Sequence, residues 1–153
     1  MKTLKIIFIL AFLYLLVPLQ IWSQECTNYH ELGDCIMDRD RAYKKYSQSK
    51  SVLITIHDTV ELNLIFYGQK DYILSFCTDK LLYPVHFWFK DPSTGEVLYD
   101  NSQDNYIGSL NIGFEVMKPM KVQMNVLGKT AVNKDLNKYT GCVGLLIQYK
   151  DYP

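Results

Sequence analysis

Residues 59–77 read TVELNLIFYGQKDYILSFC, and apolar and polar side chains alternate in both halves of this stretch. Every second residue from Val60 to Phe66 is apolar, and the same holds from Tyr72 to Phe76. A period of two is that of a β-strand, because successive side chains point to opposite faces of a sheet. The YGQKD segment between the runs contains a glycine and polar residues, which is typical of a turn. The stretch therefore predicts two consecutive strands that each turn one face toward a core.

The same two-residue period recurs along the rest of the chain. It appears in PVHFWFK (84–90), MKVQMNVLG (120–128) and GCVGLLIQYK (141–150), and EVLYD (96–100) and YIGSLNIGFEV (106–116) are further strand candidates. Turn-like segments such as DPSTG separate these runs, and no long helical pattern intervenes. Seven or eight short strands with turn signals about every 8–12 residues predict an all-β fold, an antiparallel β-sandwich of jelly-roll type. Alternation, rather than continuous apolar runs, predicts sheets with one face in solvent.

The first residues have the features of an export signal. Two lysines form a basic start, Ile6–Val17 is a nearly unbroken apolar run, and the small Ser23 precedes the polar Gln24. This pattern predicts a signal peptide at residues 1–23 with cleavage after Ser23. The alternative is an uncleaved membrane anchor, although the apolar run is shorter than the ~20 residues that a spanning helix needs. We therefore expect a secreted or periplasmic protein that is bound to a membrane only if the signal stays uncleaved.

Residues 24–50 differ in character from the β-sandwich domain predicted at residues 51–153, and they predict a short N-terminal helical segment. Asp34 is a potential cap for a helix through Tyr46, because an Asp side chain accepts hydrogen bonds from the free amides of a first helical turn. The apolar stripe of this helix, which begins at Ile36, is narrow. We therefore expect the helix to dock on the sandwich.

All four cysteines, Cys26, Cys35, Cys77 and Cys142, follow the predicted cleavage site. An even number in an exported chain favours disulfides over free thiols. Both Cys77 and Cys142 fall on the side of their strands opposite the apolar set, so they could pair across neighbouring strands. We therefore expect Cys77–Cys142, with Cys26–Cys35 closing a small local loop. A zinc site at Cys26, His30 and Cys35 is the alternative, which an oxidising compartment disfavours.

Four stretches have the strand and turn features of a known class of module: VELNLIFYGQKDYILSFC, VHFWFKDPSTGEVLYDN, KVQMNVLG and GCVGLLIQY. They contain an apolar strand, a Gly–x–x–x–Tyr turn and a late strand on a Gly–x–x–Gly run. In these features the chain resembles the small jelly-roll modules of bacterial exported proteins, of the pre-peptidase C-terminal type and more distantly of the GOLD type. The resemblance covers residues 58–150. It implies a binding, targeting or folding accessory that is not catalytic.

The motifs of several enzyme and binding classes are missing. The chain carries 16 basic and 16 acidic residues, so no broad basic face for nucleic acid is indicated. A G-x-S-x-G serine elbow is absent, and HELGD at residues 30–34 lacks the second histidine of a metalloprotease helix. A thiol nucleophile needs a free cysteine, and an even count leaves none spare. We expect no catalytic activity, no cofactor and no nucleic-acid partner.

One polar segment could hold a cation. Residues 91–105, DPSTGEVLYDNSQDN, contain Asp91, Asp100, Asp104 and Asn105, whose side-chain oxygens are ligands that calcium prefers. The segment lacks the spacing of an EF-hand loop, and Asx-rich segments are commonly plain turns. Calcium binding by these residues is therefore the alternative to a turn.

Trp88 is the residue that most needs an explanation. The alternation of Val85, Phe87 and Phe89 puts His86 and Trp88 on the face away from the core. Either the N-terminal helix or a loop covers the indole, or Trp88 is an anchor for a protein or a carbohydrate.

The sequence thus predicts a secreted or periplasmic, non-catalytic binding module with a protein or carbohydrate partner. One alternative is a structural component of the cell envelope that its uncleaved N-terminus retains. The other is a small hydrolase with an unrecognised site. A clustered His–Asp or His–Glu pair in a deep pocket would favour the enzyme, whereas a flat aromatic patch would favour the binding module.

Overall fold

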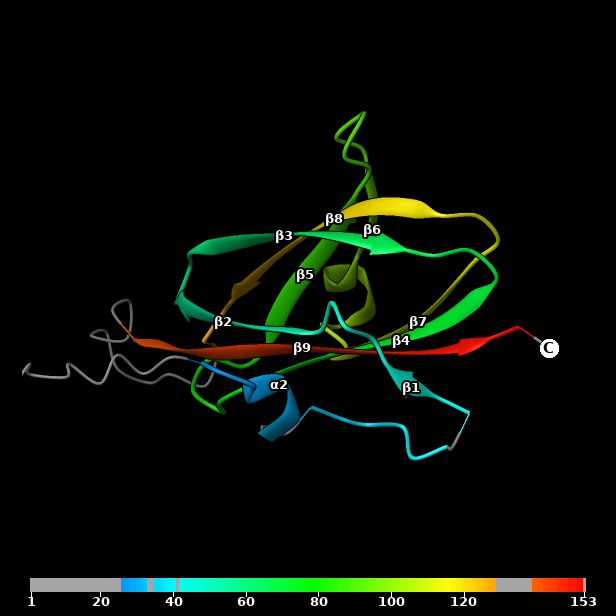
Figure 1. The fold of residues 1–153 in the computed structure, drawn as a ribbon. Helices are drawn as coiled ribbons and strands as arrows, with labels where there is room; N and C mark the ends of the chain where they lie inside the picture. The colour runs from blue at the N-terminus through cyan, green and yellow to red at the C-terminus, as the bar shows by residue number, and fades with distance from the viewer. Residues whose placement is uncertain (1–25, 33–34, 41, 129–138, 153) are drawn as a thin grey trace, which may run out of the picture.

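Two antiparallel sheets face each other across one apolar core in the computed structural model (Figure 1). The structure describes residues 26–32, 35–40, 42–128 and 139–152. The predicted signal peptide at residues 1–23 and its cleavage site lie outside the described residues, as does Asp34, the predicted helix cap.

The strands follow the predicted alternating runs closely. The elements are α2 (Tyr29–Leu32), β1 (Lys44–Lys45), β2 (Lys50–Thr55), β3 (Thr59–Phe66), β4 (Lys70–Thr78), β5 (Val85–Lys90), β6 (Val97–Asp100), η1 (Asn101–Asp104), β7 (Ser109–Phe114), β8 (Lys118–Val126) and β9 (Thr140–Asp151). Sheet A has the order β2-β9-β4-β7, with β1 pairing the far end of β9, and sheet B has the order β3-β8-β5-β6. Strands β2 to β9 are thus arranged as a jelly roll, which confirms the predicted fold class.

The core lies between the two sheets and is built by the predicted alternation. In β5, Val85, Phe87 and Phe89 are buried while the residues between them are half-buried. Strands β3 and β8 alternate in the same way, and their register places Leu62 opposite Val122. Sheet B therefore has one face in the core and one toward solvent, as predicted. The largest fully buried side chains are Tyr72, Phe66, Phe87, Phe89, Leu64, Leu74, Leu82, Met124, Leu145, Leu146, Ile147 and Val122.

Sheet A departs from this pattern, because both of its faces are covered. Strand β4 turns Tyr72 into the core, and the next residue, Ile73, is also buried although it points the other way. In β9 the outward-facing Leu146 and Gln148 are buried as well. The cover on this outer face is the N-terminal segment, defined here as residues 26–32, 35–40 and 42–43. The expectation of one solvent-facing side on each sheet is therefore wrong for sheet A.

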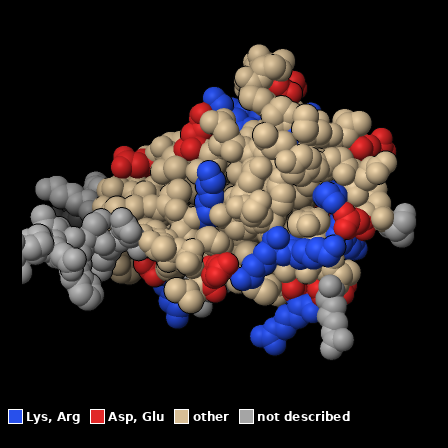
Figure 2. All heavy atoms as spheres, viewed as in Figure 1, with Lys and Arg blue, Asp and Glu red and all other residues tan. Residues whose placement is uncertain are grey.

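Charged side chains of both signs lie beside one another on the face drawn in Figure 2. At the end of sheet A, Lys70 and Lys44 both form ion pairs with Asp151. Lys150 lies 3.9 Å from Asp71, measured from Nζ to Oδ2. Such exposed pairs contribute little to stability, because solvent screens them.

The predicted helix from Asp34 to Tyr46 does not form. The helix that exists, α2, is a single turn that precedes this stretch, and β1 occupies Lys44–Lys45. Ile36, the start of the predicted apolar stripe, is 73% exposed. Tertiary contacts override the weak helical pattern, because the side-chain amide of Gln148 forms hydrogen bonds with both the N–H and the carbonyl of Asp38. It accepts from the Asp38 N–H at 2.8 Å and donates to the Asp38 carbonyl at 2.9 Å.

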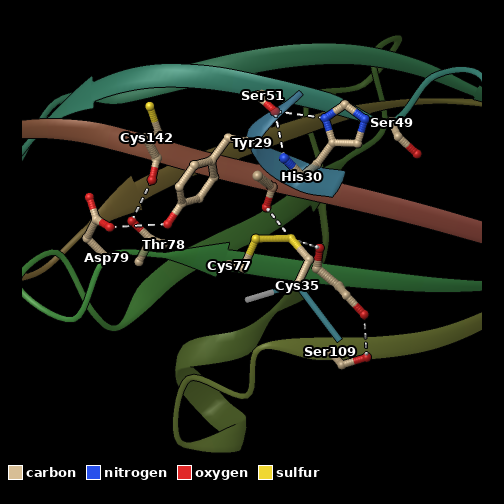
Figure 3. Close-up of a disulfide and its surroundings, with 12 residues drawn as sticks. Tyr29, His30, Cys35, Ser49, Ser51, Cys77, Thr78, Asp79, Ser109 and Cys142 are labelled. Atoms are coloured by element: carbon tan, nitrogen blue, oxygen red, sulfur yellow. Dashed lines mark hydrogen bonds between the residues drawn. A yellow bond between two sulfur atoms is a disulfide. The ribbon is translucent and has the colours of Figure 1, made fainter. Parts of the chain in front are cut away.

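The disulfides differ from the predicted pairing. Cys26 is bonded to Cys142, with a Cα–Cα distance of 5.5 Å. Cys35 is bonded to Cys77, with a Cα–Cα distance of 4.7 Å (Figure 3). Cys77 and Cys142 do leave their strands on the face away from the core, as predicted. However, the register places Cys77 opposite Gly144, two residues beyond Cys142. The N-terminal segment covers this face, so each strand cysteine bonds to a cysteine of that segment rather than to the other.

Candidate functional site

The outer face of sheet B is the solvent-facing side of the sandwich, in contrast to the covered face of sheet A. Its strand register brings Glu61 of β3, Gln123 of β8, Trp88 of β5 and Asp100 of β6 into one row across the sheet. Directly opposed residues on one face of a sheet are close enough for their side chains to touch. We call the surface formed by these four residues and His86 the Trp88 face.

Trp88 is held by hydrogen bonds along this row. Its indole Nε1–H donates to Gln123 Oε1 at 2.7 Å, and Gln123 Nε2 donates to Glu61 Oε2 at 2.8 Å. The imidazole of His86 lies against the indole, with 4.7 Å between ring centroids and 41° between ring planes. Trp88 is half-buried in these contacts with its own sheet. These contacts within sheet B thus fix the position of the indole.

The N-terminal helix does not cover Trp88. Helix α2 packs on β9 and β2, which belong to sheet A, whereas Trp88 lies on β5 of sheet B. The alternation therefore correctly placed His86 and Trp88 together on the outer face. Whether the indole binds a partner stays a prediction.

Charges of both signs surround the indole. Lys121 Nζ lies 2.9 Å from Glu61 Oε1, and hydrogen bonds from Lys121 and Gln123 hold the pKa of Glu61 below its ordinary value. His86 Nε2 lies 2.9 Å from Asp100 Oδ1. Burial raises the pKa of Asp100, but hydrogen bonds from Ser102 and His86 outweigh that effect and leave it lowered. The Trp88 face therefore presents an aromatic centre with acidic and basic groups around it.

The proposed calcium ligands are separate in the structure. Asp91 Oδ1 accepts hydrogen bonds from the Ser93 and Thr94 backbone in the turn after β5. Asp100 caps η1 and contacts His86, and Asp104 Oδ2 accepts from the Tyr99 hydroxyl at 2.8 Å. Within the described ranges, no three His, Cys, Asp or Glu side chains come together as a metal site would require. The local hydrogen bonds account for each of the three carboxylates as part of a turn or cap.

His30 does not lie with two free thiols, because both neighbouring cysteines are in disulfides. It contacts Ser51 instead: Ser51 Oγ accepts from the His30 backbone N–H at 2.9 Å and lies 2.7 Å from the ring Nδ1 (Figure 3). Burial lowers the pKa of His30, which favours the neutral ring.

A serine beside a histidine also occurs in hydrolases, so the Ser51–His30 pair bears on the enzyme alternative. In those sites a carboxylate orients the imidazole from its other nitrogen. In the described part of the chain, no carboxylate hydrogen-bonds to the second ring nitrogen of His30. Ser51 Oγ is also occupied by a backbone amide. The hydrogen bonds between His30 and Ser51 therefore connect α2 to β2. The His86–Asp100 pair, by contrast, lies on the outer face of sheet B.

Sequence reasoning missed a groove at the open edge of the sandwich. Strands β6 and β7 end their respective sheets on the same side, and the space between them has a volume of 360 Å³. Its lining residues are Phe89, Leu98, Tyr99, Leu110, Ile112, Gly113, Phe114, Lys118 and Met120. The apolar residues of β7 were visible in the sequence, but the sequence does not reveal that β7 is an edge strand among the described strands.

Comparison with known proteins does not identify a family for this chain. No protein-family model matches it, and no curated protein does. The resemblance to pre-peptidase C-terminal modules therefore finds no support. A similar solved structure is that of Aeromonas hydrophila PliG, a periplasmic lysozyme inhibitor of g-type lysozyme, with 10% sequence identity and a TM-score of 0.45. The match covers 75% of this chain and 92% of that one.

The described residues contain no helix of the length and apolarity that crossing a membrane requires.

Proposed function

We propose that this protein is an exported, non-catalytic binding module and that the Trp88 face is its recognition surface for a protein partner. The observation that carries the proposal is the position of Trp88, fixed by Gln123 and His86 at the centre of the solvent-facing side of sheet B. The two disulfides support export, because such bonds persist in oxidising compartments.

The surroundings of Trp88 favour a protein over a sugar. Residues that dominate protein interfaces are often tryptophans ringed by polar groups, and here Glu61, Lys121 and Asp100 form such a ring. A sugar-binding platform instead needs a free ring face on the indole. Part of the Trp88 surface is taken up by His86 at 4.7 Å.

The test is affinity capture from the exported fraction of the natural host, with the mature protein as bait. Trp88→Ala is compared with Tyr43→Ala, a half-buried aromatic of the N-terminal segment on the opposite sheet. The captured protein is then purified and titrated against each variant. We expect Trp88→Ala to weaken its binding by about 2 kcal/mol, and Tyr43→Ala to leave the affinity unchanged.

Melting curves of the same variants separate recognition from packing. If Trp88 serves only packing, Trp88→Ala lowers the free energy of unfolding by roughly 3 kcal/mol, and any captured protein binds Trp88→Ala and Tyr43→Ala with the same affinity. That result would overturn the proposal. If no protein is captured and the module binds glycans on an array in a Trp88-dependent manner, the partner is a carbohydrate and not a protein.

A further inference from the structure

The groove between β6 and β7 is a second surface, distinct from the Trp88 face. Leu110, Ile112 and Phe114 of β7 point toward the core and pack against it, yet each remains only partly buried. Both sheets end here, because β7 pairs only with β4 and β6 only with β5 among the described strands. The apolar residues of β7 are therefore partly exposed along this edge.

The lining combines a long apolar surface with one cation. Of the nine lining residues, Lys118 is the only one with a charged side chain. Tyr99 brings a hydroxyl, but it is used to donate to Asp104 at 2.8 Å. A pocket of a few hundred Å³ with apolar walls and one or two polar groups is typical of small-ligand sites.

Lys118 has no ion-pair partner within the described residues. Asp91 is near enough that Lys118 helps to lower its pKa, but its Oδ1 accepts from Ser93 and Thr94 in the turn and no ion pair with Lys118 forms. The half-buried Lys118 thus places a cation at the wall of an apolar groove. An anion attached to an apolar chain satisfies both features at once.

We propose that this groove binds a free single-chain amphiphile with an anionic head, of the long-chain carboxylate class. The chain lies against Leu110, Ile112 and Phe114, and the carboxylate pairs with Lys118. The ligand is a monomeric amphiphile rather than a lipid held in a bilayer, because the apolar surface is a recess between two strands and not an exposed patch.

The experiment is calorimetric titration of the mature protein with dodecanoate, below the concentration at which it forms micelles. Lys118→Gln removes the cation, and Leu98→Glu places a negative charge at the groove wall, where Leu98 is 42% exposed and tolerates a larger side chain. Lys44→Gln, an equal charge change on the remote strand β1, is the control. Dodecanol, which has the same chain without the charge, is titrated in parallel.

We expect saturable one-to-one binding of dodecanoate. Lys118→Gln should weaken it about tenfold while dodecanol binding is unchanged, because only the carboxylate gains from the ammonium. Leu98→Glu should weaken the binding of both ligands, and Lys44→Gln that of neither.

Four outcomes overturn the proposal. Dodecanoate does not bind. It binds Lys118→Gln and Leu98→Glu as tightly as the wild type. The protein co-sediments with phosphatidylglycerol vesicles in a Lys118-dependent manner but does not bind the free ligand, which assigns the surface to a bilayer. Light scattering shows a dimer that Leu98→Glu dissociates, which assigns the groove to a second copy. None of these outcomes involves the Trp88 face, so they leave the proposed function intact.

Discussion

Gly144 has no side chain at a point where the N-terminal segment lies directly against sheet A. A Cβ added there would lie 2.7 Å from His30 Cα, 2.8 Å from Cys77 Sγ and 3.0 Å from Cys35 Sγ. These atoms belong to a backbone and a disulfide and cannot rotate away. We expect Gly144→Ala to lower the free energy of unfolding by about 1–3 kcal/mol, the typical effect of overpacking, as measured by urea denaturation.

Gly108→Ala is the matched control for this change. A Cβ at Gly108 meets only the Phe76 carbonyl oxygen, at 3.4 Å, which is close to ordinary contact. The explanation by close packing of the N-terminal segment fails if the two alanine variants lose equal stability.

His30 should make stability depend on pH. Burial lowers its pKa below the ordinary value of 6.5, while Glu31 raises it and Lys45 lowers it by smaller amounts. The unfolded chain therefore takes up a proton more readily than the folded one. Stability is fully present above pH 6.5 and declines as the pH falls through the lower pKa of the folded state.

Melting temperatures measured between about pH 7.5 and about pH 5 check this prediction. We expect the decline to be smaller in His30→Gln than in the wild type. His57→Gln, at an exposed histidine, should retain it. Parallel curves for wild type and His30→Gln would contradict the prediction.

Residue-level inference from the sequence was reliable where a strand period applied. It placed Trp88 and His86 on one face and Cys77 away from the core. It could not identify Asn101, which looks like a loop residue within NSQDN but is fully buried. Its side chain accepts from the Phe87 N–H and donates to the carbonyls of Val85 and Ile107, all at 3.0 Å. Such a role depends on which segments meet in space, and local composition does not contain that information.

At the scale of elements, the N-terminal segment is attached to sheet A by two long-range disulfides. Cys26–Cys142 spans a sequence separation of 116 and Cys35–Cys77 one of 42. In the chain-entropy model such loops stabilise by roughly 5 and 4 kcal/mol when each bond is considered alone. We expect Cys35→Ser/Cys77→Ser to lose about 2–4 kcal/mol in urea denaturation, less than the model because packing of the segment persists.

Peptide mapping without reduction checks the connectivity directly. It should recover Cys26 linked to Cys142 and Cys35 linked to Cys77. Recovery of a peptide with Cys26 linked to Cys35 would instead restore the local loop expected from the sequence and contradict the arrangement of the N-terminal segment.

The strands β3 to β9 could be predicted because each corresponds to a strand-like run in its own sequence, whereas β2 at Lys50–Thr55 was not among the predicted runs. The N-terminal segment could not. Its conformation is set by partners more than 100 residues away, such as the Asp38–Gln148 pair. A weak helical stripe is a poor guide when covalent bonds and buried amides impose another path. The groove could not be predicted for a similar reason, because an edge strand differs from a central strand only in its neighbours.

For the molecule as a whole, the predicted export signal makes a mass prediction. If residues 1–23 are removed, the mature chain begins at Gln24. Both disulfides then form after export. The intact mass of protein recovered outside the cytoplasm should correspond to residues 24–153 less four hydrogens, with a further loss of ammonia if Gln24 cyclises. A full-length chain in the membrane fraction would support the envelope alternative.

The Cys26–Cys142 bond also determines how the molecule would respond to a pulling force. Tension applied between Cys26 and the end of β9 at Asp151 passes through the disulfide and along β9 beyond Cys142, because the bond bypasses the chain between the two cysteines. The part of the jelly roll from β2 to β8 therefore cannot be drawn out while the bond is intact, and only the β9 residues after Cys142 can be pulled from their neighbours. Reduction removes this restriction and lets the tension act on the chain between Cys26 and Cys142.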